Sequence, residues 1–164
     1  SMEDAEALRW GAAVGAIIAG GSGTSAHRLS VQAVREMLGA PDAAVFLLGT
    51  GTAANALALA QLCPPWGRIF CHRTAHIETS ESGAPAWMAG GAQLALVEGE
   101  FGRMTPDTLS ARIADYPQED EHDVRNAVVS ITNATEWGTV HAPQAVAALA
   151  AVWAMLRKTG RRDE

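Results

Sequence analysis

The sequence predicts an α/β fold with three layers, in which a mostly parallel sheet of buried strands is covered by helices on both faces. Short apolar segments alternate with longer segments of helical periodicity along the chain, and strands buried on both faces have this unbroken apolar character. Hydrophobic residues make up 48% of the 164 residues and charged residues 18%, so the chain can bury a core and is not expected to be disordered.

The N-terminal part is predicted to hold two helices. Residues 4–18 carry a stripe of apolar residues at helical spacing, and the glycine-rich residues 20–23 end that pattern. A second helix is expected over residues 24–38, where a Thr-Ser pair supplies the N-cap. We therefore divide the chain into an N-terminal helix with a glycine-rich joint, residues 1–23, and a main unit, residues 24–164.

Four strands alternate with helices in the remainder. The expected strands, with the first and the last of them central in the sheet, are residues 43–48, 68–72, 93–97 and 127–131. The expected helices start near Thr52 and end at Cys63, cover residues 85–89, start at Thr105-Pro106, and run from Pro143 to about Thr159.

Charge and composition argue against several partners. The net charge is −6 and only 12 residues are Lys or Arg, so the basic surface of a nucleic-acid binder is missing. No apolar run reaches the roughly 20 residues of a membrane span. The two cysteines lack paired spacing, and no signal-peptide pattern is found. We expect a reduced, cytoplasmic protein that binds neither nucleic acid nor a membrane.

Residues 49–55, with the sequence GTGTAAN, follow the first expected strand and open a helix. In open parallel sheets, ligands bind at the carboxyl ends of the strands, where helix N-termini favour anions. The hydroxyls of Thr50 and Thr52 can donate hydrogen bonds there. The lysine of a P-loop and the G-x-G-x-x-G pattern are both absent. The segment is therefore either a phosphate cradle or an ordinary tight turn.

Three histidines, His72, His76 and His122, are expected in loops at strand ends, where imidazoles commonly bind ligands or transfer protons. His76 begins a polar segment in which Glu81 follows five residues later. Cys71, His72 and His76 lack the spacing of zinc ligands, and no metal site is expected. On these observations alone each histidine is either structural or catalytic.

Three motifs together resemble the L-threonine aldolases, the beta-eliminating-lyase branch of fold-type-I pyridoxal-phosphate enzymes. Residues 46–60, FLLGTGTAANALALA, resemble the family's phosphate-binding turn. Residues 75–84 are similar to its A-H-x-x-x-x-E-x-G-A segment, and residues 130–140, SITNATEWGTV, resemble its S-L-T-Q-A-T-E-x-G-T-V-Y segment. The resemblance implies that residues 24–164 are a fragment of the family's large domain, with its C-terminal part missing.

The resemblance also implies a cofactor, pyridoxal 5′-phosphate. Its phosphate would be held by three consecutive residues, Thr50, Gly51 and Thr52. His76 would stack on the pyridine ring and take part in handling the substrate. His122 matches a family histidine near the substrate hydroxyl, and Glu81 would orient His76 or order water. The implied enzyme is a carbon–carbon lyase that cleaves β-hydroxy-α-amino acids, such as L-threonine to glycine and acetaldehyde, as a dimer or tetramer.

Several family elements have no counterpart in these residues. The N-terminal Ser-Asp-Asn segment is missing, and the Tyr-Gly-x-Asp-Pro loop is altered at residues 21–25. The His-x-Asp-Gly-Ala-Arg strand and the Schiff-base lysine are also missing, and Lys158, the single lysine, lies outside the lysine motif. We therefore expect an incomplete aldolase chain that cleaves no threonine by itself. The alternatives are a noncatalytic relative and an unrelated module that binds a phosphate ligand.

Overall fold

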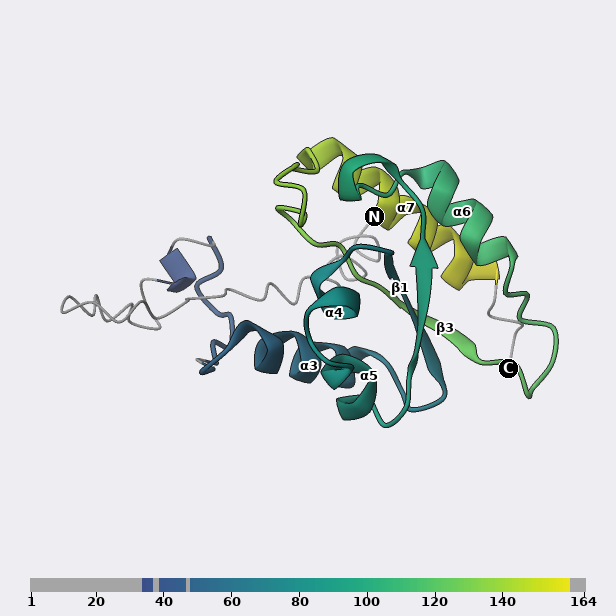
Figure 1. Ribbon diagram of the computed structural model, residues 1–164, viewed down its shortest axis with the longest axis horizontal. Helices are drawn as coiled ribbons and strands as arrows, with labels where there is room; N and C mark the ends of the chain where they lie inside the picture. The colour runs from purple at the N-terminus through teal and green to yellow at the C-terminus, as the bar shows by residue number, and fades with distance from the viewer. Residues whose placement is uncertain (1–33, 37–38, 47, 160–164) are drawn as a thin grey trace.

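The computed structural model describes residues 34–36, 39–46 and 48–159 (Figure 1). The helix expected over residues 4–18 and the division at residues 23 and 24 lie outside the described residues. Of the helix expected over residues 24–38, residues 34–36 are described and are helical.

The described residues form a three-stranded sheet in the order β2-β1-β3. Its strands are β1 (Gly67–His72), β2 (Gln93–Val97) and β3 (Arg125–Val129). Both neighbours run parallel to β1. The parallel α/β fold is confirmed, and so are the two strands expected at residues 68–72 and 93–97. The last strand begins two residues earlier than expected.

Helices cover both faces of the sheet, as Figure 1 shows. One face carries α3 (Gly51–Leu62), α4 (His76–Thr79) and α5 (Ala84–Met88), and the other carries α6 (Pro106–Ala114) and α7 (Pro143–Thr159). A short 3-10 helix, η1 (Glu100–Gly102), follows β2. Alternate side chains of β1 enter opposite cores: Ile69 packs toward α3 and α5, and Phe70 packs toward α6 and α7.

The helix starts follow local sequence signals. Thr50 caps α3, because its side chain accepts a hydrogen bond from the Ala53 N–H. Thr105 and Thr108 form a reciprocal capping box at the start of α6, where Pro occupies the first helical position. The helix expected near Thr52 thus begins one residue earlier, at Gly51, while the starts expected at Thr105-Pro106 and Pro143 are confirmed.

The prediction of a central strand at residues 43–48 is wrong. Residues 43–46 and 48 are irregular, and Phe46 is 82% exposed. A strand needs free backbone groups for its ladder, but the Ala43 N–H donates to the Ala40 carbonyl and the Ala43 carbonyl accepts from the Arg35 side chain. The expected order is also wrong, since β1 is central and β3 is an edge strand of the described sheet.

Candidate functional site

The N-terminus of α3 presents backbone donors. The first N–H groups of a helix have no acceptor within it, and in α3 these belong to Gly51 and Thr52. The next two N–H groups are engaged by Thr50, whose side chain accepts from Ala53 and whose carbonyl accepts from Ala54. The first turn of α3 contains no acidic residue. Its partial positive charge is therefore available to an anion.

The space in front of this turn is open. Gly49 and Thr50 are exposed, and a Cβ placed on Gly49 would meet no described atom within 4 Å. Two backbone N–H groups, a threonine hydroxyl and room for approach suit a phosphate group. The residues present therefore fit the phosphate of pyridoxal phosphate.

His76 stands at the start of α4, just beyond the carboxyl end of β1. Its side chain is 41% exposed. His72, the last residue of β1, is instead buried at 5% exposure. The ring of His72 bonds to the Thr74 hydroxyl at 2.9 Å and to the Gly99 carbonyl at 3.1 Å. His72 thus ties the ends of β1 and β2 together, while His76 is accessible to a ligand.

Glu81 connects His76 to α3. It is 2% exposed, and its Oε1 accepts a hydrogen bond of 2.6 Å from Asn55 Nδ2. The same oxygen lies 3.9 Å from His76 Nε2. Its Oε2 has no hydrogen-bond partner among the residues that the structure describes. Since Asn55 is the fifth residue of α3, this chain of contacts places His76 beside the N-terminal half of that helix.

A second carboxylate contacts His76 from the loop between β3 and α7. Glu136 Oε1 lies 3.0 Å from His76 Nδ1. The neighbouring Trp137 donates its indole N–H to the Thr74 hydroxyl at 3.3 Å. The loop therefore contacts the segment that follows β1 at two points.

His122 is not brought to this cluster. It lies in the loop before β3, at the amino edge of the sheet, whereas His76 follows the carboxyl end of β1. Its side chain is 87% exposed, and its backbone N–H donates to Asp120 Oδ1. The structure thus joins His76 with Glu81 and leaves His122 apart from them.

Two of the residues that contact His76 or Glu81 have no role predicted from the sequence. Asn55 lies at the end of the GTGTAAN segment, and Glu136 lies in the SITNATEWGTV segment. Both lie inside motifs that resemble the family, and this is the sequence signal that points to a functional role for them. Their partners are 26 and 60 residues away in the chain, so spacing could not reveal the contacts.

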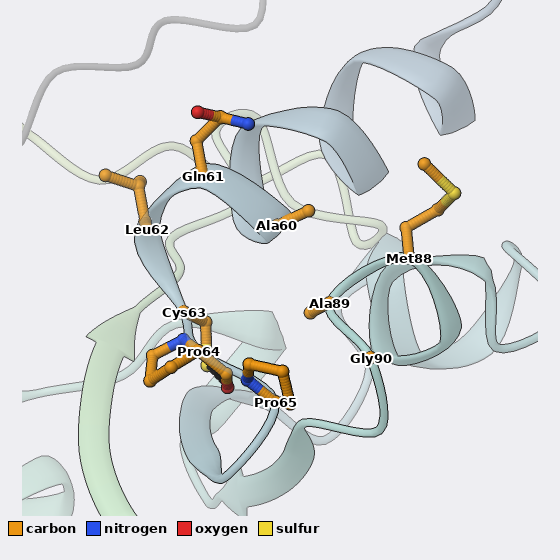
Figure 2. A pocket seen from close by; sticks show the side chains of 9 residues that line it. All are labelled: Ala60, Gln61, Leu62, Cys63, Pro64, Pro65, Met88, Ala89 and Gly90. Carbon is orange, nitrogen blue, oxygen red and sulfur yellow. Dashed lines mark hydrogen bonds between the residues drawn. The ribbon is translucent and has the colours of Figure 1, made fainter.

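A separate hollow lies at the amino edge of the sheet, away from His76. Figure 2 shows the residues that line it. It is lined by the end of α3, by Pro64 and Pro65, and by residues 88–90. Cys63 in its wall and Cys71 in β1 are both buried free thiols. Burial raises the pKa of Cys63, and it raises the pKa of Cys71 to about 12. Neither thiol is therefore a ready nucleophile at neutral pH.

No group of three potential metal ligands gathers within the part of the chain that the structure describes. None of the helices described there is long and apolar enough to cross a membrane.

The parallel sheet with helices on both faces matches the fold of fold-type-I pyridoxal-phosphate enzymes. Residues 4–160 match the family model described as beta-eliminating lyase. The chain belongs to the beta-eliminating lyase family.

Individual relatives agree with this assignment. The chain is 43% identical over 110 residues to a low specificity L-threonine aldolase of Pseudomonas aeruginosa, and 41% identical over 110 residues to one of a Pseudomonas species. Each match covers 67% of this chain and 31% of the relative. A solved threonine aldolase structure from Leishmania major aligns with a TM-score of 0.68 at 26% identity, over 79% of this chain and 36% of that one. The chain thus spans about a third of the length of these relatives.

Proposed function

We propose that the start of α3, His76 and Glu81 form part of the cofactor site of a pyridoxal-phosphate lyase. This lyase cleaves β-hydroxy-α-amino acids, for example L-threonine to glycine and acetaldehyde. The observation that carries the proposal is the link from α3 through Asn55 and Glu81 to His76. This link connects the N-terminal half of α3 to the accessible imidazole of His76, which supports a shared site for a phosphate and a ring. The relatives described as threonine aldolases support the substrate class.

Each residue has a specific task in this proposal. The N–H groups of Gly51 and Thr52 and the hydroxyls of Thr50 and Thr52 would bind the phosphate. His76 would contact the pyridine ring. Pyridoxal phosphate, when bound, supplies the electron sink needed to break the bond between Cα and Cβ of the substrate.

Glu81 bounds the site on the buried side of His76, because its own buried side chain is fixed by the hydrogen bond from Asn55. We assign His122 no role in this site, because it lies at the other edge of the sheet.

The phosphate cradle is tested with pyridoxamine 5′-phosphate, which has no aldehyde and so cannot bond to an amine by chance. Calorimetric titration should show that it binds more tightly than pyridoxamine, which lacks the phosphate. Thr52→Val should weaken its binding by about 1–3 kcal/mol, the usual cost of a lost hydrogen bond to a charged group. Thr108→Val, another threonine in the first turn of a helix, is the matched control and should leave the affinity unchanged.

Equal affinity for the two ligands would contradict the cradle. A His76→Ala variant separates the cofactor site from a module that binds any phosphate ligand. Loss of affinity for pyridoxamine 5′-phosphate, with inorganic phosphate binding retained, supports the cofactor site. Equal retention of both favours the general phosphate module.

A further inference from the structure

We propose that Glu136 is the positioning residue that sets the orientation and the tautomer of His76. Its consequence for cofactor binding rests on the proposed function. Its effect on the imidazole itself does not, and the two are tested separately below.

The contact between the two side chains is direct. Glu136 Oε1 lies 3.0 Å from His76 Nδ1, within hydrogen-bond distance. A carboxylate only accepts hydrogen bonds, so in a neutral imidazole this contact requires the proton to be on Nδ1. The Nε2 atom then carries the lone pair. Glu136 therefore makes Nε2 of His76 a hydrogen-bond acceptor toward a ligand.

Glu81 is the other candidate for this task, but its geometry does not fit. Its Oε1 stands 3.9 Å from His76 Nε2, beyond hydrogen-bond distance. That oxygen already accepts from Asn55 at 2.6 Å. Glu81 is thus a fixed buried carboxylate near Nε2, whereas Glu136 makes the hydrogen bond to Nδ1.

The loop that carries Glu136 is anchored on both sides of it. The hydroxyls of Thr135 and Thr139 both donate to the Phe101 carbonyl, and the Thr135 N–H donates to the Thr139 carbonyl. Trp137 donates to Thr74, two residues before His76. The backbone at Glu136 is therefore fixed relative to the start of α4. Its side chain needs little further ordering to form the hydrogen bond with the imidazole.

Long-range ¹H–¹⁵N correlation spectra of the full chain test the tautomer. The spectra are recorded in alkaline buffer at about pH 8.5, where model imidazoles are neutral, and His76→Gln assigns the signal. In the parent chain we expect the Nδ1–H form of His76 to dominate. Glu136→Ala should shift the population toward the Nε2–H form. Glu136→Gln should largely restore the parent signal, because its amide oxygen can still accept from Nδ1–H.

Glu121→Ala is the matched control. Glu121 is an exposed glutamate 3.9 Å from the His122 ring, so its removal changes a carboxylate beside another histidine. The His76 signal should not respond to it. A dominant Nε2–H form in the parent chain, or an unchanged His76 signal in Glu136→Ala, overturns the proposal.

The affinity for pyridoxamine 5′-phosphate provides the second readout. Because one side chain must then be ordered on binding, Glu136→Ala should weaken binding about two- to tenfold, with a circular dichroism spectrum like that of the parent. Unchanged affinity in this variant overturns the consequence of Glu136 for cofactor binding. If the parent chain binds no pyridoxamine 5′-phosphate, the proposed function fails, and the tautomer of His76 alone decides on Glu136.

Discussion

His141 occupies an unusual position for an imidazole. It is 4% exposed, and neither ring nitrogen has a hydrogen-bond partner in the residues that are described. Burial lowers the pKa of His141, nearby Arg103 and His72 lower it further, and the Met104 backbone partly opposes the shift. The related family motif ends in Tyr where this chain has His141. A group that resists protonation in the folded state makes stability depend on pH.

The sign of this dependence follows from linkage. The unfolded chain takes up a proton at His141 as the pH falls below about 6.5, while the folded chain does not until lower pH. The stability due to neutral His141 is therefore complete above that pH and is lost as the pH falls through the folded-state pKa. Urea unfolding at pH 7.5 and pH 5.5 should show a decrease in the free energy of unfolding.

The decrease should be smaller in His141→Tyr. His122→Gln, which removes an exposed histidine, should keep the pH dependence of the parent chain. An identical pH dependence in His141→Tyr and the parent would show that other groups cause it.

Among the elements, β1 is held to its neighbours by a buried arginine. Arg68 is 7% exposed, and it donates to the Val124 carbonyl and the Asn126 side chain at 3.0 Å and to the Gln93 side chain at 3.3 Å. Its guanidinium lies 3.8 Å from the centre of the Tyr116 ring. One side chain thus links the starts of all three strands.

Replacement of Arg68 by Leu should lower the free energy of unfolding by about 2–4 kcal/mol, because several acceptors lose their donor. Arg73→Leu is the control at the other end of β1. Arg73 is 59% exposed and pairs with Glu98 at 3.3 Å, a surface pair worth less than about 1 kcal/mol. Chemical denaturation measures both variants, and equal losses would contradict the assigned role of Arg68.

The sequence predicted elements best where a local signal determined them. The capping threonine and proline marked the start of α6, and the buried apolar runs marked β1 and β2. The same apolar character gave a wrong strand prediction at residues 43–48. A strand forms only where a neighbouring strand pairs with its backbone, and no local pattern reports that neighbour. The same distinction holds for the residues of the candidate site. Motifs led to His76 and Glu81, whereas the contact of Glu136 with His76 depends on the tertiary fold.

At the scale of the whole molecule, the helices α3 and α5 leave large apolar side chains exposed. They are Leu57, Leu62, Trp87 and Met88, with Trp87 78% exposed. Because α3 and α5 pack against each other, these residues lie on neighbouring helices, and exposed apolar surface of this kind favours association. We propose that the chain forms homo-oligomers through these helices.

Light scattering after size exclusion should report a mass above that of one chain. The double variant Leu62→Glu and Trp87→Glu should lower it, whereas Val140→Glu, at an exposed valine beyond β3, should not. A strictly monomeric parent chain at high concentration would contradict the proposal.

Cleavage of threonine by a pyridoxal-phosphate enzyme needs an amine placed at the cofactor and a carboxylate on the pyridine nitrogen. The single lysine, Lys158, is the next-to-last residue of α7. This helix follows the loop after β3 and runs back along the sheet, as Figure 1 shows. Its 17 residues span roughly 25 Å. Its end therefore lies toward the amino edge, while His76 lies at the carboxyl edge.

We accordingly expect the chain saturated with pyridoxal phosphate to release no glycine from threonine, and Lys158→Ala to behave like the parent. The competing view is that a second copy donates Lys158 to the site. It requires a borohydride-stable adduct on Lys158, located by peptide mass, together with glycine release that disappears in Lys158→Ala. Since α7 and α3 cover opposite faces of the sheet, only contact between copies could bring that lysine to His76, and turnover that depends on Lys158 would establish such an assembly.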